Sequence, residues 1–426
     1  SEEAFWSPLK GTVNEAKFRF SKGTAGNRPS FAAQYETYNV SGGIISKQNL
    51  GNKDLLPEFS TETELGFDFS IMNKYSVQIT QATSIIENQI LLVPLQGFYG
   101  YESQWKNAGT LKSKTLEMSL QAVLMSTRDM QWTANVLYDK STSEITEFDL
   151  PPYLWSPEES WWAFPVFMNQ KGELLGNLYG HKFIRDLDDL PSHVEKSEFD
   201  INDDGYVVWV GSGNNYEMGI SDNLWGGSTT LYSSDSSSSS SYNWGRPIIY
   251  SEEDGNDIVN IGTTNPDFNY AFGTDFRFKG LSVYLLFEGQ KGGNIYNFTR
   301  QWAFRDHASP EDNQGDKKDS EKKPTVYYDD LYDVAAPNSH FVEDASYLKL
   351  QELAVRYDLN LSRLGFNNRV TLGVIGRNLI TWSDYLGYDP DVGASNNDGG
   401  SAVIARFDGY QYPNFRTLTF TLEVEI

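Results

Sequence analysis

The segment Asn414–Ile426, which reads NFRTLTFTLEVEI, alternates polar and apolar residues at every position from Thr417 onward. Its apolar residues are Leu418, Phe420, Leu422, Val424 and Ile426, and its polar residues are Thr417, Thr419, Thr421, Glu423 and Glu425. Successive side chains of a β-strand point to opposite faces, so this segment predicts a strand with one apolar and one polar face. Such a strand fits either a soluble sandwich, where the apolar face meets a core, or a membrane barrel, where it meets lipid.

The same alternation recurs along the chain and predicts ten strands. We place them near residues 16–20, 64–71, 75–80, 115–124, 130–136, 272–278, 281–287, 345–358, 370–374 and 414–426. In the strand at 345–358 the alternation changes phase around Gln351 and Glu352, which predicts a β-bulge at that point.

The connections between these strands are short and long in strict turn. The short ones are 72–74, 126–128, 278–280 and 360–368, and the long ones are about 22–59, 85–111, 143–266, 291–344 and 379–413. Tight turns at one rim and long loops at the other are typical of bacterial outer-membrane barrels, whereas a sandwich does not sort its connections in this way. We therefore predict an all-β, antiparallel transmembrane β-barrel with long extracellular loops and short periplasmic turns.

The composition of the 426 residues excludes several other classes of protein. No run of residues approaches the ~20 apolar residues of a membrane-spanning helix. Aromatic residues reach 14%, as expected where aromatic belts mark both membrane interfaces. Cysteine is absent, which excludes disulfides, thiol catalysis and metal sites built on cysteine. The net charge of −24 argues against nucleic-acid binding.

The N-terminal stretch SEEAFWSPLKG has neither the basic region nor the apolar core of a signal peptide, so we do not expect Ser1 to be the biological start. The predicted lumen-facing residues are mostly Ser, Thr, Gly, Gln and Asn, which would not fill the interior of a small barrel. We therefore expect residues 1–426 to be the C-terminal part of a larger barrel domain, with 143–266 as a large extracellular loop.

Eight short motifs extend over nearly the whole chain. They are LLPEFSTETELGFDF (Leu55–Phe69), Asn107-Ala108-Gly109 followed by Leu116-Glu117, GELLGNLYGH (Gly172–His181), FDINDDGYV (Phe199–Val207), IGTTNPDFNYAFG (Ile261–Gly273), EDASYLKLQEL (Glu343–Leu353), GRNLITWSDYLGYDPDVG (Gly376–Gly393) and YPNFRTLTF (Tyr412–Phe420). In this order they resemble the motifs of SusC/RagA-type TonB-linked (TonB-dependent) outer-membrane transporters. Three features depart from that family: Thr115 stands where glycine is usual, Ile426 where an aromatic residue is usual, and residues 208–258 contain an apparent insertion.

The resemblance implies a 22-stranded barrel of which this chain supplies the ten C-terminal strands. It also implies an N-terminal plug domain and a TonB box, neither of which is present in this chain. The implied activity is nutrient import powered by TonB. The implied partners are outer-membrane lipid, TonB and a SusD-like surface lipoprotein that closes the mouth as a lid.

One loop has the spacing of a calcium ligand set, and we expect no other cofactor. Its candidate ligands are Asp200, Asn202, Asp204 and Tyr206, at positions 1, 3, 5 and 7 of a loop of the EF-hand type, with Gly205 at position 6. Position 12 is Gly211 in place of the bidentate glutamate. Two interpretations stay open: a weak Ca²⁺ site and a turn rich in Asx residues.

The loop 143–266 contains six of the eleven tryptophans: Trp155, Trp161, Trp162, Trp209, Trp225 and Trp244. Exposed aromatic faces give a large contact area at low entropic cost and suit the binding of sugars or peptides. The alternative is that these side chains pack the loop into a small core of its own or against a partner.

We expect no enzymatic activity. The four histidines, His181, His193, His307 and His340, lie far apart and in no catalytic motif. Two functions remain. The first is TonB-dependent import of glycan or peptide fragments under a SusD-like lid. The second is a structural or adhesive barrel subunit that anchors a larger surface complex and transports nothing.

Overall fold

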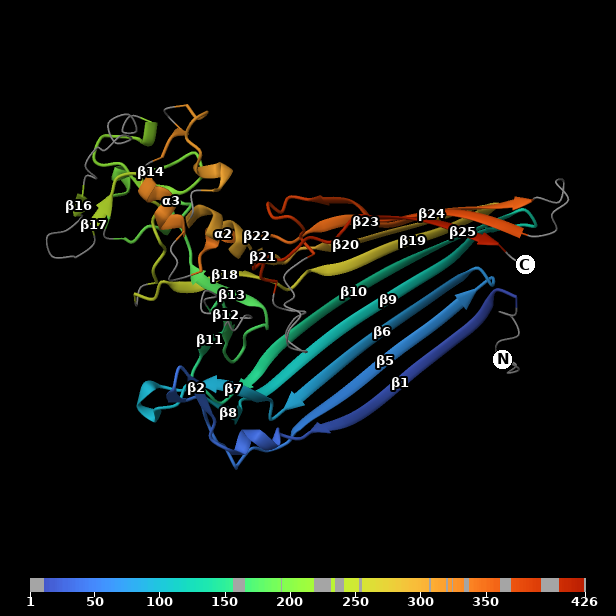
Figure 1. Ribbon diagram of the computed structural model, residues 1–426, viewed down its shortest axis with the longest axis horizontal. Coiled ribbons are helices and arrows are strands. Elements are labelled where there is room, and N and C mark those ends of the chain that lie inside the picture. The colour runs from blue at the N-terminus through green and yellow to red at the C-terminus, as the bar shows by residue number, and fades with distance from the viewer. Residues whose placement is uncertain are drawn as a thin grey trace.

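The computed structural model describes residues 11–155, 165–192, 194–217, 231–233, 241–252, 255–305, 308–318, 321–323, 325–332, 337–360, 369–391 and 406–424. Its main feature is a sheet of ten long strands, shown in Figure 1. They are β1 (Val13–Asn27), β5 (Glu58–Ile71), β6 (Tyr75–Glu87), β9 (Gly109–Ser126), β10 (Met130–Phe148), β19 (Phe268–Phe278), β20 (Leu281–Lys291), β23 (Tyr347–Asn360), β24 (Arg369–Ser383) and β25 (Thr417–Val424). Each predicted strand corresponds to one of these, so the alternation located all ten.

The sheet runs up and down in chain order, because each long strand pairs antiparallel with the next long strand. The tight connections at 72–74, 127–129 and 279–280 lie at one rim, and the long connections lie at the other (Figure 1). In the first turn, Met72 and Asn73 both have positive φ, at 54° and 51°, and Lys74 N donates to Ile71 O at 3.0 Å. This is a type I′ turn, whose twist matches that of the flanking strands. The predicted connection 360–368 falls almost entirely outside the described residues.

The predicted bulge in β23 is confirmed. Leu350 pairs with Phe287 and Glu352 pairs with Leu286, so Gln351 has no partner position on β20. The register with β24 shifts at the same residue. This extra residue explains why the polar and apolar positions of the sequence change phase there.

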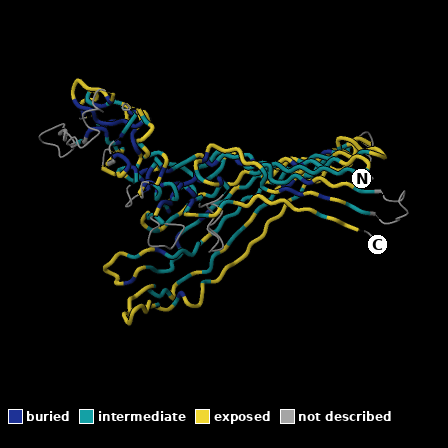
Figure 2. Tube along the Cα trace, turned by 45° about the horizontal axis from the view of Figure 1, so that its top comes forward, coloured by how far each residue is buried: buried dark blue, intermediate teal, exposed yellow. Residues whose placement is uncertain are grey.

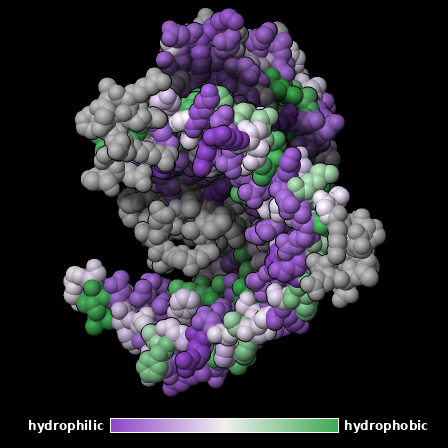
Figure 3. Space-filling model, turned by 90° about the vertical axis from the view of Figure 1, so that its right-hand side faces the viewer, coloured by the Kyte–Doolittle hydropathy of each residue, from purple (hydrophilic) through white to green (hydrophobic). Residues whose placement is uncertain are grey.

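The sheet has one polar face and one apolar face. On the polar face, hydroxyl groups pair across β9 and β10, with Ser113 Oγ 2.8 Å from Ser143 Oγ. On the opposite face, Phe67, Leu120 and Phe420 are 43%, 40% and 77% exposed. Viewed from the end with the tight turns, the molecule curves around a hollow (Figure 3). Apolar side chains exposed this widely on one face are those expected to contact lipid in a barrel wall.

The two outer edges of the sheet do not pair with each other in the described residues. β25 pairs with β24, from Val370–Val424 to Arg377–Thr417. β1 pairs with β5 at the other end of the strand order. The chain therefore does not close a ten-stranded barrel by itself, and both edges present backbone groups that lipid cannot satisfy.

The first two long connections form small β-structures above the rim. These are the hairpin β2 (Tyr38–Ser41) and β3 (Ile44–Lys47), and a three-stranded sheet of β4 (Asn49–Leu50), β7 (Ile90–Pro94) and β8 (Ser103–Asn107). Gly51, directly after β4, packs closely against the short helix Phe31–Gln34 of the same connection, since a Cβ atom at Gly51 would be 2.6 Å from Gln34 O.

The later long connections, 149–267, 292–346 and 384–408, build a compact body that we call the loop domain. It contains a four-stranded sheet of β11 (Tyr153–Trp155), β12 (Phe167–Asn169), β13 (Asn177–His181) and β18 (Ile258–Thr263). It also contains the strand pairs β14 (Phe199–Ile201) with β15 (Val207–Trp209), β16 (Leu231–Ser233) with β17 (Ser241–Asn243), and β21 (Asn294–Tyr296) with β22 (Val342–Asp344). Its helices are α2 (Phe298–Arg305) and α3 (Thr325–Tyr332). No described helix combines the length and the apolar character needed to cross a membrane.

Most buried residues lie in the loop domain and not in the long sheet (Figure 2). One core cluster packs Phe167, Tyr296, Phe304, Tyr327 and Phe407 from five different segments. Burying one such aromatic side chain stabilises the fold by roughly 1.5–3 kcal/mol. The loop domain is therefore held by a core of its own, whereas the long sheet gains its burial from a membrane.

Candidate functional site

The polar face of the long sheet forms a hollow of about 650 Å³ near the rim with the tight turns. Its walls come from β19, β20, β23, β24 and β25, and include Asp275, Tyr284, Arg356, Thr371 and Glu423. These residues occupy alternate positions of neighbouring strands, so the period of two places all of them on one face. The hollow is polar and solvated, as expected for the interior of a transport barrel.

Ion pairs between arginine and carboxylate side chains line this inner face. Arg19 Nε lies 3.0 Å from Asp68 Oδ2, and Arg19 Nη1 lies 3.0 Å from Glu64 Oε1. Gly66 leaves room for this guanidinium, since a Cβ atom there would be 2.7 Å from Arg19 Cζ. Further along the sheet, Arg377 Nε lies 2.8 Å from Glu352 Oε2. The wall thus presents both charged donors and charged acceptors to anything that moves along it.

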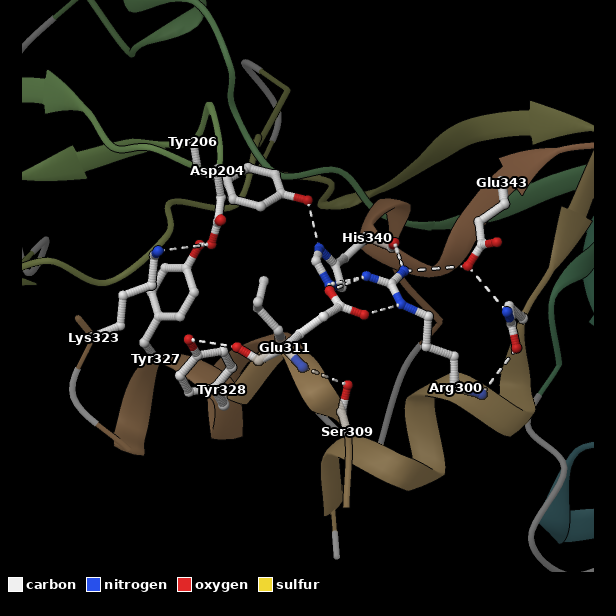
Figure 4. A network of polar contacts seen from close by, with 12 residues as sticks. Asp204, Tyr206, Arg300, Ser309, Glu311, Lys323, Tyr327, Tyr328, His340 and Glu343 are labelled. Carbon is white, nitrogen blue, oxygen red and sulfur yellow. Dashed lines mark hydrogen bonds and ion pairs between the residues drawn. The ribbon is translucent and has the colours of Figure 1, made fainter. Parts of the chain in front are cut away.

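A second polar centre lies inside the loop domain, around Arg300 of α2 (Figure 4). Arg300 Nε donates to Glu311 Oε1 at 2.6 Å, and Nη1 donates to Glu343 Oε1 at 3.2 Å and to His340 O at 3.0 Å. The side chains of Arg300 and Glu343 are only 12% and 9% exposed. A buried cation needs such partners because its desolvation costs several kcal/mol. Arg300 therefore fixes three separate segments of the loop domain to one another.

His340 is neutral in this network. Arg300 Nη2 donates to His340 Nε2 at 3.0 Å, so the ring proton belongs on Nδ1, which lies 2.7 Å from Tyr206 Oη. Burial and the positive charges of Arg300 and Arg185 hold the pKa of His340 well below its usual value of 6.5. Burial also raises the pKa of Tyr206 to about 12, so its hydroxyl stays protonated at neutral pH.

The low pKa of His340 predicts that acid destabilises the loop domain. Between the folded pKa and about 6.5, the unfolded chain binds a proton that the folded chain does not, so stability falls as the pH falls. The loss is roughly 1.4 kcal/mol per pH unit below about 6.5. Hydrogen exchange of the loop-domain amides at pH 7.5 and 5.5 measures it. His340→Gln retains an acceptor for Arg300 and should lose this dependence on pH; an unchanged dependence would argue against the assignment.

The predicted calcium loop is a turn between β14 and β15. Asn202 Oδ1 accepts hydrogen bonds from the backbone N–H groups of Asp204 (3.1 Å) and Tyr206 (2.9 Å). Asp204 Oδ2 accepts from the hydroxyl of Tyr327 at 2.7 Å and lies 3.2 Å from Lys323 Nζ (Figure 4). The ammonium group of Lys323 thus occupies the neighbourhood in which a calcium ion would sit.

Asp200, the first of the proposed ligands, has a different role. Asp200 Oδ2 accepts from the backbone N–H of Tyr216 at 2.8 Å and so anchors a separate loop. In the described part of the chain, no three His, Cys, Asp or Glu side chains gather closely enough to hold a metal ion. Asp200, Asn202, Asp204 and Tyr206 therefore do not fit a calcium ion here, and the Asx-rich turn is the arrangement observed.

The tryptophans of the large loop occupy different environments. Trp209 and Trp244 are each 4% exposed in a core cluster of the loop domain, where Trp244 stacks on Tyr216 at 5.8 Å. Trp155 packs at 5.0 Å from Phe167, at the edge of the other core cluster. The expectation of exposed faces is wrong for Trp209 and Trp244, since their rings hold the domain together. Trp161, Trp162 and Trp225 lie outside the described residues, so ligand binding by them remains a prediction.

Exposed aromatic rings occur on other loops instead. Phe31, Phe98, Tyr388 and Tyr412 are each more than three quarters exposed. Sequence reasoning missed them because single aromatic residues in separate connections give no local cluster. It also missed Lys349, which is 2% exposed and whose Nζ lies 2.8 Å from Asp389 and 3.0 Å from Asp391. The sequence offered only a weak signal for this contact, the close spacing of Asp389 and Asp391.

Comparison with known proteins gives consistent matches. The model of the TonB-dependent receptor-like β-barrel family matches residues 6–209. TonB-dependent receptors P3 and P39 of Formosa agariphila are 26% and 25% identical to this chain over 444 and 458 residues. These alignments cover 97% and 100% of this chain, but only 40% and 41% of the two relatives.

Among solved structures, the RagAB peptide transporter superposes with a TM-score of 0.64 at 19% sequence identity. The superposition covers 97% of this chain and 41% of that one. The RagAB peptide importer in its closed-closed state gives a TM-score of 0.65 over the same fractions. The chain thus shares the barrel fold of these proteins and spans about two fifths of their length.

Proposed function

Since the chain belongs to the β-barrels of TonB-dependent outer-membrane receptors, we propose that the full-length protein imports glycan or peptide fragments. The observation that carries this proposal is the inner face of the sheet. Polar side chains lie on it both toward the long loops, as at Ser60 and Ser113, and near the tight turns, where Asp275 and Glu423 line the hollow of about 650 Å³. A wall of this kind offers a solvated path, whereas a purely structural anchor has no need of one.

The charges on that wall favour peptide fragments over neutral glycans. Arg19 with Asp68, and Arg377 with Glu352, place cations and anions side by side along the path. A peptide carries both charges at its termini and backbone groups that both donate and accept hydrogen bonds, so it matches such a surface. The similarity in fold to the RagAB peptide transporter supports the same choice.

The proposed partners follow from the family and not from contacts in this chain. TonB would act through parts of the receptor beyond residues 1–426. A SusD-like lipoprotein would cover the loop rim, where Phe31, Phe98 and Tyr412 expose large aromatic surfaces. Exposed aromatic residues of this kind are common anchors of protein interfaces.

Uptake by whole cells tests the proposal. Cells with the full-length gene, cells without it and cells without a working TonB system receive labelled oligopeptides or oligosaccharides. We expect uptake of one class to disappear in both defective strains. Unchanged uptake of both classes, together with the loss of a surface complex, would instead identify an anchoring subunit.

A further inference from the structure

The outward face of the sheet carries an aromatic belt on its long-loop side. Tyr138 of β10 stacks on Phe268 of β19 at 5.4 Å, and Phe268 lies 6.0 Å from Tyr270. All three side chains occupy outward positions of the ladder, on the loop side of apolar residues such as Val136 and Leu120. Aromatic rings in a membrane barrel mark the level of the lipid headgroups. This belt therefore locates the outer-leaflet interface on the sheet.

Three lysines follow this belt toward the loop rim: Lys112 and Lys114 on β9 and Lys140 on β10. We call them the lysine cluster. Lys140 is the next outward residue after Tyr138, and Lys114 pairs with Thr142, two residues beyond Lys140. Lys114 and Lys140 are thus diagonal neighbours, with Cβ atoms about 7–8 Å apart. Lys112 lies about 7 Å further along the same strand.

The cluster carries a net positive charge, because the ladder places one carboxylate, Glu144, beside its three lysines. None of the three ammonium groups forms an ion pair with a described carboxylate, although Glu144 stands directly opposite Lys112 in the ladder. Lys114 and Lys140 are exposed, and Lys112 is half-buried. Like charges this close repel each other, so an anion that binds between Lys114 and Lys140 would stabilise the arrangement.

We propose that the lysine cluster binds the phosphate groups of lipopolysaccharide, the phosphorylated glycolipid of the outer leaflet. The belt of Tyr138, Phe268 and Tyr270 places the cluster at headgroup level, and the long lysine stems extend along the apolar wall to that level. Basic groups on a membrane protein at this depth recognise anionic headgroups. The chain has 58 acids and 34 lysines and arginines in total, so unpaired bases gathered on the lipid face stand out. This inference rests on the membrane location and does not require the import activity.

Binding of purified lipopolysaccharide to the full-length receptor in detergent tests the proposal. Each lysine near an anionic headgroup contributes about fivefold in affinity, so K112Q/K114Q/K140Q should weaken binding on the order of a hundredfold. The corresponding arginine variant should bind nearly as wild type does. The matched control is K53Q/K171Q/K279Q, which removes the same charge from two exposed loop residues and one turn residue. Heat-modifiable gel mobility confirms that each variant is a folded barrel.

A second arm separates the lipid from other anions. Lipopolysaccharide treated with phosphatase should bind wild type about as weakly as the intact lipid binds the glutamine variant. The proposal fails if the glutamine variant binds the intact lipid as tightly as wild type does, or if dephosphorylation has no effect. Complete displacement of the lipid by millimolar inorganic phosphate would also overturn it, because the site would then be one for the free ion.

Discussion

Replacing Phe420 with arginine should destabilise the barrel by about 2–4 kcal/mol, whereas Thr419→Arg should cost far less. Phe420 lies in mid-strand opposite Val374, on the apolar face, and is 77% exposed. In the membrane that exposed surface contacts lipid, where a guanidinium group loses its hydration. Thr419 faces the solvated interior, where an arginine side chain keeps its water. Which of the two substitutions is more destabilising depends only on which face of the strand contacts lipid.

The measurement is the urea dependence of folding of the full-length receptor into phospholipid vesicles. A matched pair on one strand removes most effects of strand pairing, since both variants retain the same backbone hydrogen bonds. Equal losses of stability in the two variants would show that the faces are assigned wrongly.

The second large effect is expected in the loop domain. Arg300→Met should destabilise it by about 3–5 kcal/mol, because Glu343 and Glu311 then lose their cation while Glu343 stays buried. Burial already raises the pKa of Glu343, so removal of Arg300 should raise that pKa further. The segments that Arg300 joins, near residues 311 and 340–343, should separate from α2 most readily.

Hydrogen exchange of the amides in α2 and in 337–344 measures this change, with protection expected to fall by two to three and a half orders of magnitude. Arg305→Met is the control, since Arg305 lies on the same helix but is exposed, with its guanidinium group over the ring of Trp302 at 4.5 Å. That change should cost at most about 1 kcal/mol. Similar effects of the two substitutions would mean that the buried network does not hold the domain.

The ten strands were predictable from sequence because each strand of a wall between lipid and water needs one apolar and one polar face. Each residue of Thr417–Val424 faces either lipid or the aqueous interior. Polar and apolar residues therefore alternate there without exception. Even the bulge at Gln351 was visible as a change of phase. The lengths were underestimated, because the ends of β9 and β10 extend beyond the membrane, where neither face must be apolar.

The loop domain was not predictable in the same way. Arg300, Glu311 and His340 are spread over forty residues and meet Tyr206 from a distant segment only after the chain has folded. Local spacing at Asn202 left a calcium site and an Asx-rich turn open, and the structure forms the turn, with Asp204 paired to Lys323. Burial of Trp209 could not be read from the sequence, since exposed and buried rings look alike there.

One face of this sheet lines water and the other lines lipid, and this can be measured residue by residue. The chain contains no cysteine, so single cysteines along 113–120 of β9 can be placed in the full-length receptor, with any others removed, and studied in outer-membrane vesicles. We expect water-soluble maleimide to label positions 113, 115, 117 and 119, and a lipid-soluble quencher to reach positions 116, 118 and 120. Equal labelling along the strand, or the reverse alternation, would contradict this assignment of the two faces.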